Sequence, residues 1–135
     1  MTEIFLAVAI VFGILILALL NIFGRKFHRR VNQKYFYKQW NMILSQVKTP
    51  EGRILAIIDA DKLLDQALRR SGLRGKTVGE RLVAAQRKLS DNDAVWYAHK
   101  LRNRLVHEPN VKLKKSEAQL ALTGFRQGLR DLGAL

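Results

Sequence analysis

The sequence contains no cysteine, and only two of its 135 residues are proline. Without cysteine the chain forms no disulfide and offers no thiolate to a structural zinc site, which excludes thiol chemistry. Few prolines leave long stretches of backbone free to form helices, because proline disrupts the interior of a helix. No segment alternates apolar and polar residues in the way that a half-buried strand does. The sequence therefore predicts an all-α fold.

Acidic residues are also scarce. The chain has 11 Asp and Glu against 24 Lys and Arg, a formal net charge of +13. A basic surface attracts polyanions, which here means the phosphate backbone of a nucleic acid or anionic lipid headgroups. Part of the excess follows an apolar run near the N-terminus, and the rest is spread over the chain. We interpret the excess as an indication that a nucleic acid is a partner; the alternative is a surface of solvated lysines and arginines.

Charge is absent from residues 4–23, IFLAVAIVFGILILALLNIF. A helix of about 20 apolar residues spans the hydrocarbon core of a bilayer. The alternative is a cleaved signal peptide, which needs a basic N-terminal region, a shorter apolar core and a small-residue cleavage site. The flank Met1-Thr2-Glu3 is acidic instead. We therefore predict an uncleaved transmembrane anchor over residues 1–24.

Cations flank this run on its C-terminal side, and no acidic residue intervenes before Glu51. They are Arg25, Lys26, Arg29, Arg30, Lys34 and Lys38. The positive-inside rule places such a flank in the cytoplasm. We therefore expect a single-pass protein of the inner cell membrane, with its N-terminus outside and its C-terminal domain in the cytoplasm.

Residues 25–48 combine these cations with five aromatic rings and form an expected juxtamembrane helix or linker. The rings are Phe27, Tyr35, Phe36, Tyr37 and Trp40. Aromatic rings and cations beside a span mark the membrane interface, so we expect contact with anionic lipid headgroups. The helical spacing of Trp40, Ile43, Leu44 and Val47 leaves an alternative, in which this segment packs on the domain or on a second chain.

Residues 49–135 are expected to form a small bundle of four up-down helices. Thr49 with Pro50 is a cap for the first helix, which runs to about Ser71. Thr77 opens the second helix, residues 90–93 supply caps for the third, which stops near Pro109, and Ser116 opens the fourth. A domain of this size buries a limited core. We therefore expect a homodimer.

A helical wheel separates two stripes on the third helix. The core stripe comprises Ala94, Ala98, Leu101 and Leu105, and the second comprises Trp96, Asn103 and His107, with His99 at its edge. Arg102 falls in an apolar arc, on a different face from Asn103 and His107. The apolar stripe of the first helix likewise contains Asp61 and Asp65, and a buried carboxylate needs a partner. We hypothesise that one of these aspartates pairs with Arg102; the alternative is that both reach water.

The stretch Arg102-Asn103-Arg104-Leu105-Val106-His107 has the pattern Arg-x4-His, with Asn directly after the Arg. It lies late in the third expected helix and follows Ala98-His99-Lys100-Leu101. This pattern resembles the signature of the HEPN superfamily, small helical domains that include ribonucleases and nucleotide-binding proteins. The resemblance covers residues 49–135 and excludes the anchor and the basic linker.

The resemblance implies an endoribonuclease that needs neither metal nor cofactor and acts as a dimer with two facing motifs. Its expected catalytic residues are Arg102, Asn103 and His107. The supporting residues are His99, Asp61, Asp65 and Trp96, and Lys100 and Arg104 are expected to bind RNA. An imidazole exchanges protons near neutral pH, and a guanidinium binds phosphate oxygens. The resemblance also implies a context of defence, stress or toxin–antitoxin systems, with an antitoxin or regulatory protein as a partner.

A non-catalytic alternative uses the same residues differently. In it, Arg102 only neutralises an aspartate, Asn103 bridges helices, and His107 closes a helix C-terminus, where a cation is favoured. The chain is then a membrane-tethered helical module that binds RNA, a nucleotide or a protein partner.

Overall fold

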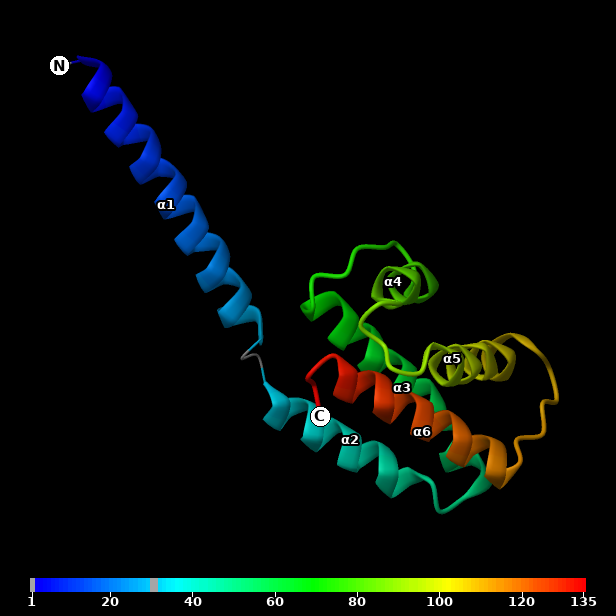
Figure 1. The fold of residues 1–135 in the computed structure, drawn as a ribbon. Coiled ribbons are helices and arrows are strands. Elements are labelled where there is room, and N and C mark those ends of the chain that lie inside the picture. The colour runs from blue at the N-terminus through cyan, green and yellow to red at the C-terminus, as the bar shows by residue number, and fades with distance from the viewer. Residues whose placement is uncertain (1, 30–31) are drawn as a thin grey trace. The chain divides into compact units, whose positions relative to one another are not determined.

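The computed structural model describes residues 2–29 and 32–135, and these form six helices and no strand (Figure 1). The helices are α1 (Thr2–Arg29), α2 (Gln33–Gln46), α3 (Pro50–Arg70), α4 (Val78–Ala85), α5 (Asn92–His107) and α6 (Lys115–Asp131). The chain divides into two units, residues 1–31 and residues 32–135. The all-α prediction is confirmed, and each unit has its own basis for stability.

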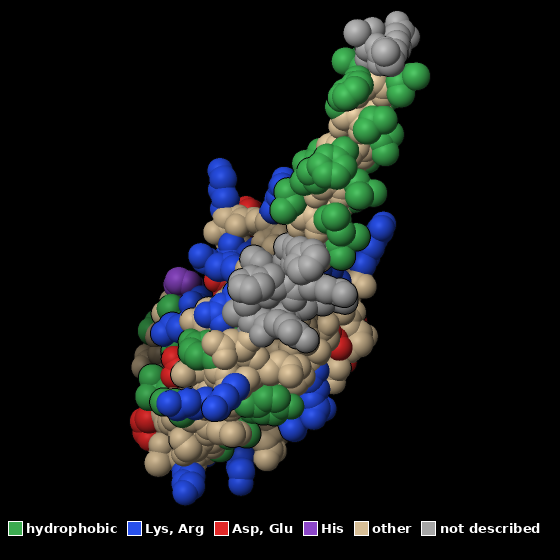
Figure 2. Space-filling view, turned by 90° about the vertical axis from the view of Figure 1, so that its left-hand side faces the viewer, with side chains coloured by type: hydrophobic (Ala, Val, Ile, Leu, Met, Phe, Trp, Pro, Cys, Tyr) green, Lys and Arg blue, Asp and Glu red, His purple; other side chains and the backbone are tan. Residues whose placement is uncertain are grey.

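The first unit is the single helix α1. Its window Ile4–Ile22 is long and apolar enough to cross a membrane, by length and composition, and none of that window is buried within the protein. Hydrophobic side chains cover it on the side seen in Figure 2. The helix continues to Arg29, beyond the predicted end of the anchor at residue 24.

Helix α2 belongs to the second unit, which therefore has five helices where the sequence led us to expect four. Phe36 and Trp40, two of the rings that we expected to contact lipid, are buried in the core. The guanidinium of Arg70 lies 5.1 Å from the ring centroid of Tyr35 and 5.3 Å from that of Phe36. The alternative of packing on the domain is thus the observed one for these rings, and the side chain of Phe27 lies outside the described residues.

Helix α3 is the centre of the second unit, because it contacts α2, α4, α5 and α6. The predicted caps of three helices are confirmed. The hydroxyl of Thr49 accepts from the Gly52 N–H, that of Thr77 accepts from the Glu80 N–H, and Asp91, within the expected stretch 90–93, accepts from the Ala94 N–H. These bonds satisfy donors that every helix leaves unpaired at its first turn.

The predicted cap of α6 at Ser116 is wrong. The cap is Lys114, two residues earlier, the helix begins at Lys115, and the Glu117 carboxylate accepts from the backbone N–H of Lys114 at 2.9 Å. In a capping box the third helical residue bonds back to the cap, so the predicted box used Gln119, whereas Glu117 takes this role in the structure. The predicted apolar face of this helix, which contains Ala118, Ala121 and Phe125, is buried as expected.

Helices α5 and α6 approach closely where α6 has no side chain. A Cβ atom at Gly124 would lie 2.5 Å from the backbone oxygen of Ala94, and one at Gly128 would lie 3.2 Å from a methyl of Val95. A backbone oxygen has no rotamer by which it can move away. The close approach therefore fixes the point along each helix at which α5 crosses α6. It fixes with it the position of every α5 side chain.

We expect Gly124→Ala to lower the free energy of unfolding by roughly 1–3 kcal/mol, the usual cost of overpacking. Gly79→Ala is the matched control, because its Cβ would meet Trp96 at 3.6 Å and the Thr77 hydroxyl at 3.9 Å, both ordinary contacts. The control should be neutral or more stable by up to about 1 kcal/mol, from helix propensity. Urea unfolding of the full chain in detergent, followed by circular dichroism, measures both. Equal stability of the two variants would contradict the close approach.

Candidate functional site

The carboxylate of Asp61 lies in the core of the second unit and is 1% exposed. Its Oδ1 lies 2.7 Å from His99 Nδ1, and its Oδ2 lies 3.4 Å from Arg102 Nε. His99 is itself buried, at 8% exposure, whereas the Arg102 side chain is 24% exposed. A buried carboxylate is tolerated only when it is paired, and here α5 supplies both partners.

Asn103 joins these two partners on its other side. Arg102 Nη1 donates to Asn103 Oδ1 at 2.9 Å, and Asn103 Nδ2 lies 3.3 Å from His99 Nε2. Asp61, His99, Asn103 and Arg102 therefore close a loop of contacts between α3 and α5, hereafter the Asp61 cycle. Each of its side chains touches the next, so the position of one constrains the other three.

The hypothesis that an aspartate pairs with Arg102 is confirmed for Asp61 as an ion pair, but not as a hydrogen bond, because Arg102 Nε has no hydrogen-bond partner. The wheel also separated Arg102 from Asn103, whereas the long arginine side chain reaches back to the asparagine. The shortest contact of Asp61 is with His99, which the sequence placed only at the edge of a stripe. The sequence placed Asp61 within an apolar stripe, which indicated the need for a partner, but nothing in it singled out His99.

Asp65 does not pair with Arg102. Its Oδ1 lies 2.6 Å from Arg81, which is 4% exposed, and its Oδ2 lies 2.9 Å from Arg69. Arg81 also donates from Nη1 to the backbone oxygen of Gly75 at 2.5 Å. Asp65 thus fastens α4 and the segment before it to α3. The sequence reasoning missed Arg81, although its position among Val78, Leu82 and Ala85 on the apolar face of α4 indicated burial.

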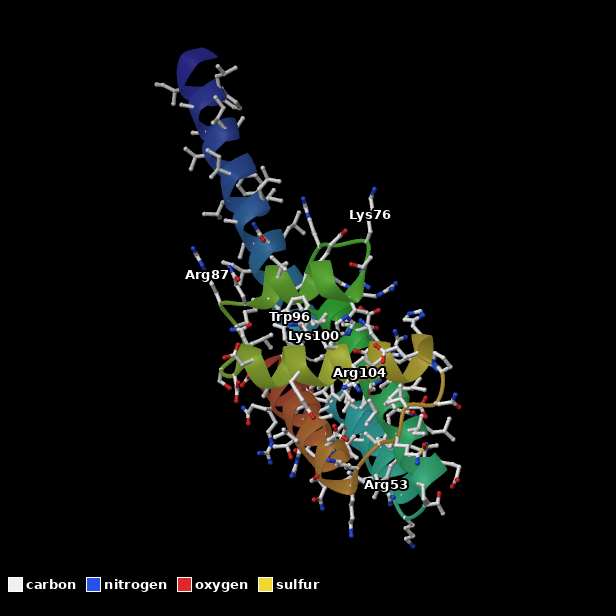
Figure 3. The ribbon with its side chains drawn as sticks, turned by 90° about the vertical axis from the view of Figure 1, so that its right-hand side faces the viewer. Arg53, Lys76, Arg87, Trp96, Lys100 and Arg104 are labelled. Carbon is white, nitrogen blue, oxygen red and sulfur yellow. The ribbon has the colours of Figure 1, made fainter. Side chains whose placement is uncertain are left out.

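The outward side of α5 presents Lys100, Arg104 and His107, all of them exposed. Trp96 lies half-buried before them, edge-on to His99 with ring centroids 6.0 Å apart. Trp96, Lys100 and Arg104 follow one another along α5 in Figure 3. His107 makes no hydrogen bond or ion pair within the described residues, so the structure brings Arg102, Asn103 and His99 together and leaves His107 apart.

The second unit as a whole carries an excess of positive charge. Residues 32–135 contain 20 Lys and Arg against 10 Asp and Glu, and two of those acids, Asp61 and Asp65, are paired inside the unit. Figure 2 shows the opposite side of the unit from Figure 3, and Lys and Arg side chains project from that side too. A surface of this sign raises the local concentration of polyanions.

Comparisons with protein-family models, with curated proteins and with solved structures found no match to this chain.

We expect Asp61→Asn to destabilise the second unit by roughly 3–5 kcal/mol, because it removes one member of a buried ionic network and leaves Arg102 without its counter-charge. Glu108→Gln is the matched control. It breaks the ion pair between Arg104 Nε and Glu108 Oε2, which lie 3.7 Å apart on side chains that are more than half exposed. The free energy of unfolding should fall by about 0–1 kcal/mol. Denaturant unfolding of both variants provides the comparison. A cost for Asp61→Asn no larger than that of the control would show that Asp61 does not organise the fold.

Proposed function

We propose that this chain is a membrane-tethered, HEPN-like endoribonuclease that cleaves RNA without a metal ion. The observation that carries the proposal is the state of Arg102. The Asp61 cycle holds its guanidinium through Nε and Nη1, while Nη2 forms no hydrogen bond within the described residues and the side chain is partly exposed. A guanidinium held in this way presents a fixed pair of donors, which suits phosphate oxygens.

Such an arginine would stabilise the charge that develops during RNA cleavage. The 2′-hydroxyl attacks the adjacent phosphorus, the bond from phosphorus to O5′ breaks, and the products are a 2′,3′-cyclic phosphate and a 5′-hydroxyl. The negative charge on the non-bridging oxygens grows in the transition state, where preorganised donors are most effective. Arg102 supplies these donors without movement, because Asn103 and Asp61 already fix its orientation.

The proton transfers require an imidazole, and His107 is the exposed one. As general base it takes the proton of the 2′-hydroxyl, and an acid must return a proton to O5′. Arg102 and His107 leave α5 in directions about 140° apart, since five residues advance a helix by that angle. We therefore place the complete site between two copies of the chain, with His107 of the partner subunit beside Arg102.

The RNA strand would run along α5, where it would contact Lys100, Arg104 and Trp96. The two cations are exposed to neutralise phosphates, and the indole offers a surface on which a base stacks. Lys76 and Arg87, in the segments that flank α4, project outward in Figure 3 and extend the positive surface.

We also propose that α1 anchors the protein in the inner membrane, with the second unit in the cytoplasm. The apolar window Ile4–Ile22 and the cations that follow it support this orientation. Lys34 and Lys38 are exposed on α2 and, with the sequence flank 25–30, supply charge for anionic headgroups. The arrangement keeps the enzyme near RNA at the cytoplasmic face, in a defence or toxin–antitoxin context.

The full chain in nanodiscs should cleave single-stranded RNA in the presence of EDTA and leave 2′,3′-cyclic phosphate ends. His107→Ala should lower the rate roughly 10²–10⁴-fold, the usual contribution of general acid–base catalysis. Gln119→Ala, an exposed position on α6, is the matched control and should cleave as the wild type does. Identical cleavage by the wild type and His107→Ala would identify a contaminating nuclease and remove the proposal.

RNA affinity tests the binding surface separately. Lys100→Ala and Arg104→Ala should each weaken binding of a labelled oligonucleotide irrespective of its sequence. Each should also reduce the slope of log Kd against log salt by about 1, because one phosphate contact is lost. Lys62→Ala, an exposed cation on α3, controls for the change in net charge. An effect of Lys62→Ala as large as that of Lys100→Ala would mean that binding does not use α5.

A second candidate function is RNA binding without cleavage. The observation in its favour is that Arg102 and Asn103 already bond within the chain and that His107 stands apart from them. Tight, salt-dependent binding together with intact RNA after long incubation would select this candidate.

A further inference from the structure

The contacts of the Asp61 cycle assign the position of each proton in it. Asp61 faces a guanidinium and an imidazole and, as a carboxylate, only accepts. The 2.7 Å contact to His99 Nδ1 therefore requires a proton on Nδ1. Arg102 only donates, so its 2.9 Å bond requires the oxygen of the Asn103 amide on that side.

The orientation of Asn103 then decides the other nitrogen of His99. With its oxygen turned to Arg102, the amide presents Nδ2 and its hydrogens to His99 Nε2 at 3.3 Å. Nε2 must accept, so the imidazole is neutral. The donations run in one direction, from Arg102 to Asn103, from Asn103 to His99 and from His99 to Asp61.

We propose that His99 is the positioning residue of the Arg102 site. As a neutral imidazole with its proton on Nδ1, it holds the amide of Asn103 in the orientation that holds the guanidinium of Arg102. The inference rests on the proposed function in assigning Arg102 to phosphate. His99 does not touch the substrate; it acts through Asn103.

Other states of His99 break the cycle. A proton on Nε2 alone leaves the lone pair of Nδ1 against the Asp61 carboxylate. A second proton places N–H on Nε2 against the hydrogens of Asn103 Nδ2, and turning the amide to accept it brings Nδ2 against Arg102 Nη1, donor to donor. The charged groups of the cycle that surround the imidazole are Asp61 from α3 and Arg102 from α5. One state satisfies all contacts, and in that state Arg102 is fixed.

The test uses the full chain in nanodiscs, labelled with 15N at histidine and arginine. At pH 7 the imidazole signals of His99 should show a protonated Nδ1 and an unprotonated Nε2. The Nε–H of Arg102 should exchange slowly with solvent, since this atom is buried. An imidazolium, or a proton on Nε2 alone, would overturn the assignment.

Two variants separate positioning from charge neutralisation. His99→Asn keeps an amide donor near Asp61 and has no atom at the place of Nε2. Loss of the hydrogen bond between His99 and Asn103 releases the amide that holds Arg102, so exchange of the buried Arg102 Nε–H should become about tenfold faster. Asn103→Asp keeps an oxygen that accepts from Arg102, but it faces His99 Nε2 with an acceptor in place of a donor. Nε2 must then carry a proton, so His99 should become an imidazolium while Arg102 exchange stays slow. Unchanged Arg102 exchange in His99→Asn would show that His99 only neutralises Asp61.

Arg81→Gln is the matched control for lost stability, because it breaks the other buried ion pair on α3. It should leave the His99 and Arg102 signals as in the wild type. Changes as large as those of His99→Asn would show that lost stability, and not lost positioning, explains the His99→Asn result. In RNA cleavage, His99→Asn should lower kcat about tenfold with KM unchanged, since positioning acts in the transition state. A wild type with the expected signals and no cleavage would remove the proposed ribonuclease and leave the positioning of Arg102 in place.

Discussion

Burial of a carboxylate on α3 is the constraint on which the second unit depends. Asp61 is 1% exposed on the helix that contacts the other four, so its charge must be matched by side chains from a neighbouring helix. Helix α5 supplies His99 and Arg102, and a rotation of α5 by one residue, about 100°, would withdraw both. The cost of an unpaired buried charge therefore sets the rotation of α5, and with it the direction in which Lys100, Arg104 and His107 face.

Apolar packing and small residues make that arrangement accessible. Gly124 and Gly128 allow α6 to approach the backbone of α5 at Ala94 and the side chain of Val95. This approach fixes the point at which α5 crosses α6. Asp65, one turn after Asp61, performs the same kind of pairing for α4 through Arg81. Two carboxylates on one helix thus place two different neighbours, and the cations that they attract lie inside a unit whose surface is otherwise strongly positive.

Arg102 combines a structural role with a proposed chemical role in this arrangement. Its Nε faces Asp61 and its Nη1 bonds Asn103, whereas the rest of the guanidinium extends toward the surface. A residue fixed by the fold is preorganised for an anion, because no reorientation is needed when the anion arrives. The five-residue spacing on α5 separates Arg102 from His107, and this separation is why the proposed ribonuclease needs a second copy of the chain. Trp96 and His99, in contact at the edge of the cycle, connect the outward surface of α5 to the buried aspartate.

Local patterns in the sequence determined the all-α fold, the caps at Thr49 and Thr77, a cap within residues 90–93, and the apolar window near the N-terminus, since each depends on neighbouring residues alone. They also indicated that Asp61 needed a partner and that Arg102 was one candidate. The tertiary structure decided that α2 packs into the core, that His99 is the nearest partner of Asp61, and that Asp65 belongs to Arg81. The physical reason is that a helical wheel gives the direction of a side chain but not its reach, nor which of several helices faces it. Burial and pairing of charge are properties of two helices together.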